Sequence, residues 1–201
     1  MKRMAYIALV FTLLLATNPL AFAQHGDGGA AAAATAPVAE AKQFDFLLGQ
    51  WELQVHPKVG SLVAMIHGAP KLAGTWKAWR VLDGLCIEDE LRIVDASANP
   101  ISLTRALRIY AKGDSRWKVS GIDAYRGRAF SASGQQQNGE MRTESQSLDT
   151  EGKPMTTRTR YFDITPDAFR MQQDRSSDNG QTWDEGVLTI DAKRTSASAT
   201  P

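Results

Sequence analysis

Residues 101–125 read "ISLTRALRIYAKGDSRWKVSGIDAY", and this stretch carries the pattern that decides the fold. On both sides of the central Lys112-Gly113-Asp114, apolar and polar residues alternate with a period of two. Such alternation is typical of a β-strand with one face against a core, and the Lys-Gly-Asp tripeptide is a turn signal. The stretch therefore predicts two antiparallel strands joined by a tight turn.

The same period recurs along most of the chain. Further strand-like stretches, bounded by turn residues, cover 75–84, 85–95, 129–148, 155–175 and 181–194. The strongest hairpin signal among them is the dipeptide Asn138-Gly139. Together these stretches predict an all-β domain of roughly eight to ten strands, either a sandwich or a closed antiparallel barrel.

The first 23 residues have the features of a secretory signal peptide. Lys2 and Arg3 precede an apolar run over 5–16, and Ala21-Phe22-Ala23 forms a small-x-small cleavage site. We expect cleavage after residue 23, a periplasmic or secreted location, and no stable membrane insertion afterwards.

The rest of the chain divides by composition. Residues 24–42 are rich in Ala and Gly and predict a disordered linker, 43–194 predict one β-barrel domain, and 195–201 predict a flexible tail. Removal of residues 1–23 leaves 21 basic and 22 acidic residues, a net charge of about −1. This balance gives no field that would attract nucleic acid, so no nucleic-acid partner is predicted.

The chain has a single cysteine, Cys86, so it has no internal disulfide. Cys86 lies in the apolar stretch 81–89, and no histidine lies near it in the sequence. Because a reactive thiol needs an activating base, the pattern favours a buried and inert side chain.

The stretch 176–184, "SSDNGQTWD", favours a tight hairpin. Asp178 can accept backbone hydrogen bonds across a turn, Gly180 can take a positive φ, and Trp183 can fold over the hairpin. A calcium loop is the alternative, but counted from Asp174 the glycine falls at position 7 and not at position 6. The pattern matches the Asp-box hairpin of sialidase propellers, which carry several copies, so one copy does not imply glycosidase chemistry.

A second marker is "FDFLLGQW" at 44–51, where a short helical turn leads into Gly49-x-Trp51. It resembles the start of lipocalin-like, or calycin, barrels. That resemblance implies that Trp51 packs at the base of a barrel under an arginine from the last strand, for which the candidate is Arg194. A guanidinium over an indole face stabilises by about 0.5–2 kcal/mol.

The two motifs together, after a signal peptide, resemble an exported bacterial family of unknown function with calycin-like barrels. The resemblance covers 44–194 and implies a single antiparallel barrel with a short N-terminal helical turn. Related haem-binding nitrobindins use a histidine near the C-terminus, whereas the histidines here are His25, His56 and His67. No cofactor is therefore predicted, and His56 and His67 lack a placed third ligand for a metal.

Side-chain parity selects the candidate site residues. The more apolar faces of the strands carry Asp89, Arg105 and Gln173 inward, and Tyr161 is favoured inward because the other face of its strand carries Arg158 and Arg160, which prefer water. One interpretation is a ligand pocket with apolar walls and a few polar groups. The other is a buried Asp89–Arg105 pair that is satisfied within the core.

Three functions are compatible with such a barrel. The favoured one is a binding protein that holds a small apolar or amphipathic ligand in its interior. An enzyme of the isomerase or cyclase kind using the same cavity is second, and it is disfavoured because no Gly-x-Ser-x-Gly or His-Glu-x-x-His motif is present. The third is an interaction module whose interior is filled by Trp76, Trp117, Phe130 and Met171.

The segment 57–75 fits neither period. Its glycines surround an apolar centre, so it predicts either a lid over one end of the sheet or an additional edge strand.

Overall fold

A computed structural model describes residues 38–60, 68, 70–148 and 151–200, all within one folded unit. Two short 3-10 helices come first, η1 (Ala39–Lys42) and η2 (Asp45–Leu47). Ten strands follow: β1 (Gly49–Pro57), β2 (Leu72–Val81), β3 (Cys86–Val94), β4 (Pro100–Ala111), β5 (Arg116–Asp123), β6 (Arg128–Gln137), β7 (Glu140–Leu148), β8 (Pro154–Phe162), β9 (Ala168–Ser176) and β10 (Asp184–Ser196).

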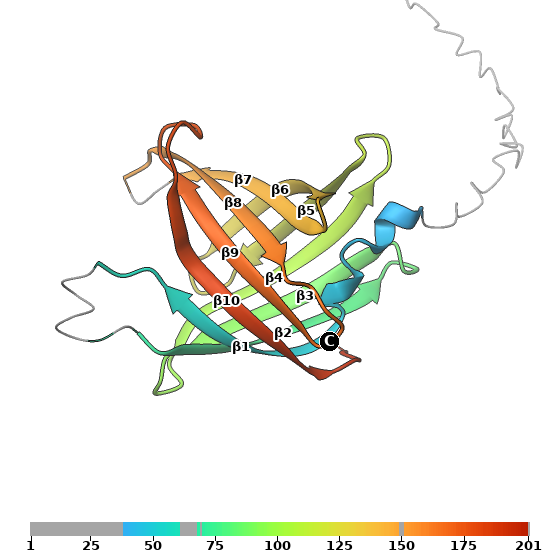
Figure 1. Ribbon diagram of the computed structural model, residues 1–201, viewed down its shortest axis with the longest axis horizontal. Helices are drawn as coiled ribbons and strands as arrows, with labels where there is room; N and C mark the ends of the chain where they lie inside the picture. The colour runs from blue at the N-terminus through green and yellow to red at the C-terminus, as the bar shows by residue number, and fades with distance from the viewer. Residues whose placement is uncertain (1–37, 61–67, 69, 149–150, 201) are drawn as a thin grey trace, which may run out of the picture. The chain divides into compact units, whose positions relative to one another are not determined.

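The ten strands form a closed antiparallel barrel (Figure 1). Each strand pairs with its neighbour in the chain, and β10 closes the ring by pairing with β1. Closure leaves no strand edge unpaired, which removes the template for edge-to-edge aggregation. The predicted all-β barrel is confirmed, and the sandwich alternative is excluded.

The predicted hairpins form where the turn residues indicated. Asn138 and Gly139 have φ values of 52° and 79°, as the two central residues of a two-residue hairpin turn require. Between β4 and β5 the Asp114 amide donates to the Ala111 carbonyl at 3.1 Å. The stretch 101–125 is therefore a hairpin, as its period predicted.

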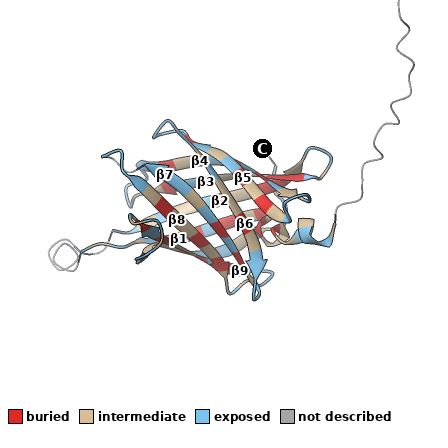
Figure 2. Ribbon diagram, turned by 90° about the horizontal axis from the view of Figure 1, so that it is seen from above, coloured by how far each residue is buried: buried red, intermediate tan, exposed pale blue. Residues whose placement is uncertain are grey.

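Burial alternates along most strands, as expected for a barrel wall with one side inward (Figure 2). Because successive strands run in opposite directions, the connections that follow even-numbered strands all lie at one end. The chain enters β1 at that end, so we call it the plug end. The connections that follow odd-numbered strands lie at the opposite end, which we call the mouth.

The segment 43–48 closes the plug end with aromatic and apolar side chains. Phe44 and Leu47 are fully buried. The Phe44 ring lies 4.9 Å from Trp117 and 5.7 Å from Tyr161, both edge-on, between ring centroids. Such packing combines a large buried apolar area with the favoured edge-to-face geometry, so the plug anchors the first strand to the core.

The Gly49-x-Trp51 motif has the role that the resemblance implied. The Arg194 guanidinium lies 4.0 Å from the Trp51 ring centroid and donates to the carbonyl oxygens of Leu48 and Phe46. Gly49 has φ of +110°, and a Cβ there would collide with the Ser196 carbonyl oxygen. Only glycine combines that conformation with so close an approach of backbone.

Three sequence expectations concern the borders of the domain and its thiol. Strand β10 continues past residue 194 to Ser196, and η1 begins within the predicted linker. Cys86 is buried, as predicted. Of the predicted 57–75 segment, residues 61–67 and 69 lie outside the described residues, and β2 begins at Leu72.

Candidate functional site

Asp89, the first predicted site residue, points into the barrel and is 2% exposed. Its partner is Arg108 and not Arg105. Arg108 Nε donates to Asp89 Oδ2 at 2.6 Å and Arg108 Nη2 to Oδ1 at 3.2 Å, while Trp76 Nε1 donates to Oδ1 at 2.8 Å. This two-point ion pair is the strongest common geometry for a carboxylate and an arginine.

The buried pair lies against the plug. The Arg108 guanidinium is 4.9 Å from the Phe44 ring centroid and 5.8 Å from that of Trp76. Burial alone would lower the pKa of Arg108, but the facing carboxylate of Asp89 raises it above its ordinary value. Arg108 therefore stays charged, and the pair is neutral as a unit.

Tyr161, the second predicted residue that faces inward, belongs to the same cluster. It is 4% exposed, and burial raises the pKa of its hydroxyl, an effect that the neighbouring Arg108 partly opposes. Asp89, Arg108, Trp76 and Tyr161 thus form a self-satisfied floor beneath the interior. They correspond to the second sequence interpretation, a pair satisfied in the core, with a different arginine.

The prediction that Arg105 points inward is wrong. Arg105 lies on the outer wall, where its Nε donates to Glu88 Oε1 at 2.6 Å and its guanidinium lies 5.3 Å from the Trp79 ring centroid. Leu107 and Ile109, which share the face of Arg105, are each 43% exposed. The parity of β4 is therefore opposite to the one that its apolar residues suggested.

The register explains the reversal. Tyr110 pairs with Trp117 across the β4–β5 turn, so Tyr110 and every second residue before it share the inward face of Trp117. Near the plug the rings of Phe44 and Trp76 already fill the interior, and β4 contributes Ala106 and a neutralised Arg108 there. In the sequence, the expected pairing of Tyr110 with Trp117 was the feature that could have indicated that Arg108 faces inward.

Gln173 points inward, as predicted, and it belongs to a set of polar side chains on three neighbouring strands. We call this set the polar wall. Its members come from the inward faces of β7, β8 and β9 and are Thr143, Ser145, Thr157, Thr159 and Gln173. Ser145, Thr157 and Gln173 lie in the mouth half of their strands, whereas Thr143 and Thr159 lie just on the plug side of the middle, and all five are buried or half-buried.

The side chains of the polar wall make no hydrogen bond with any other described residue. In the described ranges only two side-chain polar atoms are enclosed without a hydrogen-bond partner, Trp79 Nε1 and Arg116 Nε. Neither belongs to the polar wall. The oxygen and nitrogen atoms of the polar wall therefore reach solvent-accessible space, although the residues face inward. Since buried polar groups are normally hydrogen-bonded, the interior must be open to water at this level.

An apolar surface faces the polar wall. In the ring of ten strands β3 is five places from β8 in either direction, so the two lie on opposite sides. At the level of the polar wall β3 turns Leu91 and Ile93 inward. At this level the interior of the barrel therefore has one polar side and one apolar side.

The mouth carries a charge that is already neutralised. Asp123 accepts hydrogen bonds from Ser102 Oγ at 3.2 Å and from the amides of Tyr125 and Arg126 at 3.1 Å, besides the Arg126 side chain. Burial raises the pKa of Asp123, but these donors outweigh it and hold the pKa below its ordinary value. The inward charges of the Asp89 and Asp123 groups are thus both paired.

A depression of about 400 Å³ lies on the rim of the mouth. Its lining combines Ser147 and Met155, on the inward faces of β7 and β8, with Gln146 and Thr156 on their outward faces and Asn179 from the β9–β10 connection. It therefore straddles the rim at the ends of β7 and β8. A second depression of about 360 Å³, lined by Glu52, Thr75 and Arg92 among others, lies on the outer surface.

The β9–β10 connection at the mouth is the predicted hairpin. Asp178 accepts hydrogen bonds from the Thr182 amide at 2.9 Å and from the Thr182 hydroxyl at 2.6 Å. Gly180 has φ of +88°, and Trp183 Nε1 donates to the Gly180 carbonyl at 3.0 Å. The turn interpretation is confirmed, with each motif residue used inside the hairpin.

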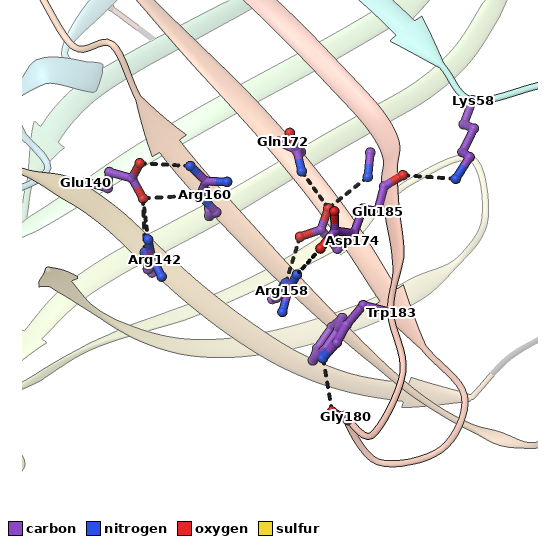
Figure 3. Close-up of polar contacts among 11 residues, drawn as sticks. Lys58, Glu140, Arg142, Arg158, Arg160, Gln172, Asp174, Gly180, Trp183 and Glu185 are labelled. Carbon is purple, nitrogen blue, oxygen red and sulfur yellow. Dashed lines mark hydrogen bonds and ion pairs between the residues drawn. The ribbon is translucent and has the colours of Figure 1, made fainter. Parts of the chain in front are cut away.

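The outer wall beside this hairpin carries a network of paired charges (Figure 3). Asp174 is 1% exposed and accepts from Arg158 Nε, Gln172 Nε2 and the Gly186 amide at 2.7–2.8 Å. Arg158 also covers the Trp183 ring at 4.1 Å from its centroid. Each member is satisfied by another, so the network reinforces the wall and leaves no group free for a ligand.

The described residues form neither a cluster of metal ligands nor a membrane-spanning helix. In the described ranges no three His, Cys, Asp or Glu side chains come together as a metal ion would require. Within the same ranges there is no helix both long and apolar enough to cross a membrane.

Comparison with known proteins gives no family. No family model matches the chain, and no curated protein matches it. Among solved structures, the chain is similar to that of EF1p2_mFAP2b bound to DFHBI, with 9% sequence identity and a TM-score of 0.40. The match covers 78% of this chain and 100% of the other. A likeness of this strength carries no functional argument, so function must be argued from the residues themselves.

Proposed function

We propose that this protein binds a small, uncharged, amphipathic molecule inside the mouth half of the barrel. The observation that carries the proposal is the polar wall, whose five side chains face inward, reach accessible space and lack hydrogen-bond partners in the described chain. A ligand that accepts or donates hydrogen bonds on one side would satisfy them. Its apolar side would lie against Leu91 and Ile93.

The electrostatics of the interior disfavour a cationic ligand. The two inward carboxylates, Asp89 and Asp123, are each paired with an arginine of the same chain. A cationic ligand would lose its hydration without gaining a free counter-charge from these groups, which is costly in a low-dielectric interior, and the register places Arg128 and Arg175 on the inward face near the mouth. Hydroxyl and amide groups, in contrast, suit neutral hydrogen-bonding molecules.

Only the plug half of the barrel has the filled interior that the interaction-module alternative expects. Trp76, Trp117 and Met171 are buried there, whereas Phe130, the fourth proposed filler, is only half-buried nearer the mouth. Export through the signal peptide 1–23 and kinship with exported calycin-like barrels remain part of the proposal. N-terminal sequencing of the protein purified from its own periplasm tests the export, and a start at Gln24 is expected.

The binding proposal is tested with native mass spectrometry and a neutral fluorescent probe. Protein purified from the producing cell should carry a small-molecule adduct, and Nile red should bind saturably at one site per chain. Thr159→Val and Gln173→Leu each remove one polar group at nearly constant volume. Loss of one hydrogen bond to a ligand weakens binding by roughly tenfold, for about 1.4 kcal/mol.

The matched control is Thr189→Val, the same substitution on the outward face of β10. It should leave probe binding unchanged. Absence of an adduct together with non-saturable probe binding would contradict the proposal, as would equal binding by Thr159→Val, Gln173→Leu and Thr189→Val.

A further inference from the structure

The large hydrophobic side chains that remain exposed are concentrated on one side of the barrel. Eight such residues are exposed in the described chain, and only Leu148 lies elsewhere. The other seven belong to the β2–β3 turn, β4, β5 and the turn after β5: Leu82, Leu85, Ile101, Leu107, Ile109, Ile122 and Tyr125. A contiguous exposed apolar surface on a soluble domain marks an interaction site.

The outward face of β4 is the centre of this surface. It reads Ile101, Leu103, Arg105, Leu107 and Ile109, which we call the β4 stripe. The stripe has the same residue type at equal distances on either side of Arg105. A two-fold rotation about an axis through Arg105, perpendicular to the strand, therefore superposes Leu107 on Leu103 and Ile109 on Ile101.

A symmetric dimer interface requires this property. In a two-fold contact the same patch faces itself, so that residue i contacts residue j and j contacts i. With β4 antiparallel to its copy, Leu107 would contact the second copy's Leu103, and Ile109 the second copy's Ile101. Ile122, which pairs with Arg105 on β5, would face its own equivalent near the axis.

Of the three charged residues that β3 places beside the stripe, Glu88 and Arg92 are complementary under the same rotation, and Glu90, which pairs with Arg105, lies at the axis. On β3, Glu88 pairs with Leu107 in the register, and Arg92 pairs with Leu103. The rotation that exchanges Leu107 and Leu103 therefore brings Glu88 opposite the second copy's Arg92, twice in the dimer. Arg105 lies at the axis, where Glu88 of its own chain neutralises it at 2.6 Å.

The available area is close to that of the smallest specific contacts. Strands β3, β4 and β5 have 9, 12 and 8 residues, each spanning ~3.4 Å along the strand, with ~4.8 Å between strands. The face would bury roughly 470 Å² on each copy, or about 950 Å² in total, near the ~1,000 Å² that a specific interface needs. Because the barrel is closed, the contact can form only through side chains and not through a strand edge.

We propose that the protein forms a symmetric homodimer through the outer face of β3, β4 and β5, with the β4 stripes antiparallel and the two-fold axis at Arg105. The interface lies on the outer wall, whereas the proposed ligand site lies inside the mouth. Either proposal can therefore fail without the other.

The first test is sedimentation velocity. The sample is the protein purified from the producing cell, in the form to which that cell processes it. The wild-type protein should sediment as a dimer at micromolar concentration. Leu107→Lys places two cations in the apolar centre and should weaken dimerisation by at least 100-fold. Leu148→Lys, the same change at the exposed leucine outside the surface, should remain dimeric, and circular dichroism checks that both variants fold.

The charge pairs test the orientation. Arg92→Glu brings two carboxylates together at each end of the interface and should weaken the dimer by at least tenfold. Combining it with Glu88→Arg and Arg105→Gln exchanges the two charges without leaving an unpaired Arg105 at the axis, and should restore the dimer. A wild-type monomer at 100 micromolar (roughly the upper range of such measurements), an equal effect of Leu107→Lys and Leu148→Lys, or failure of the exchange to restore dimerisation would each overturn the proposal.

Discussion

The two halves of the barrel differ in how they treat polar groups. In the plug half, Asp89, Arg108 and Trp76 satisfy one another under the rings of the closing segment. From the middle of the barrel towards the mouth, the five side chains of the polar wall face inward without partners in the described chain. The polar groups of the plug half therefore stabilise the fold, whereas those of the polar wall remain available for hydrogen bonds with another molecule.

The largest expected effect is loss of the buried ion pair. Arg108→Met leaves the buried side chain of Asp89 without its ionic partner, which costs about 3–5 kcal/mol of unfolding free energy. Urea unfolding measures this difference. The control is Arg105→Met, which removes a half-exposed pair on the outer wall and should cost less than about 1 kcal/mol. Equal effects of the two variants would show that the plug half does not depend on the pair.

A second effect on the plug half comes from the backbone at Gly49. In Gly49→Ala, a residue with a Cβ must adopt a φ of +110°, and its Cβ lies against the Ser196 carbonyl oxygen. We expect a loss of about 1–3 kcal/mol. Gly113→Ala, at a turn glycine with open space around its Cβ position, is the matched control and should change stability little.

At the mouth, the hairpin makes stability depend on pH through Asp178. Hydrogen bonds from Thr182, supported by Ser176, lower the pKa of Asp178 to about 2. Because this pKa is lower in the folded state than in the unfolded state, the stabilisation is complete above about pH 4. It is lost as the pH falls through about 2.

Unfolding midpoints of the wild-type protein and Asp178→Asn should therefore converge as the pH is lowered from 6 to 2. The effect should be smaller than that of Arg108→Met, because the hairpin is exposed. A difference between the two proteins that stays constant over this range would contradict the assignment, and carboxyl NMR titration of Asp178 provides the direct measurement.

The smallest effect is expected at the polar wall. Thr159→Val removes a hydroxyl that has no partner in the described chain, so the unfolding free energy should stay within about 0.5 kcal/mol of the wild type. Thr182→Val, which removes a hydroxyl bonded to Asp178 at 2.6 Å, should cost more. A clear destabilisation by Thr159→Val would mean that the polar wall is hydrogen-bonded within the protein. The polar wall would then stabilise the fold as the buried pair of the plug half does.

The two motifs and the turns were the most predictable parts of the fold. Gly49-x-Trp51 under Arg194, the Asn138-Gly139 turn and the Asp178 hairpin depend on local geometry that a few neighbouring residues define. The orientation of Asp89 and Gln173 also followed from parity, because their strands have one clearly apolar face, and that of Tyr161 followed because the opposite face carries Arg158 and Arg160. For β4 this reasoning failed, since its apolar residues lie on the outer wall.

The failure at β4 has a physical cause. Hydrophobicity predicts which face of a strand is buried only where the surroundings are those of an ordinary core. Here a buried carboxylate on β3 requires a cation, and bulky rings from the plug leave space for Ala106 and not for leucine. Neither condition is visible in residues 101–111 alone, although the pairing of Tyr110 with Trp117 indicates it.

By itself, the sequence determined the strand period, the turns, the closing motif and hence an antiparallel barrel, because these depend on interactions between near neighbours in the chain. Only the tertiary structure decided which arginine neutralises Asp89, which polar side chains converge as the polar wall, and which apolar residues remain on the surface. These features depend on strand register and on the space left between elements far apart in sequence, and no local pattern specifies either.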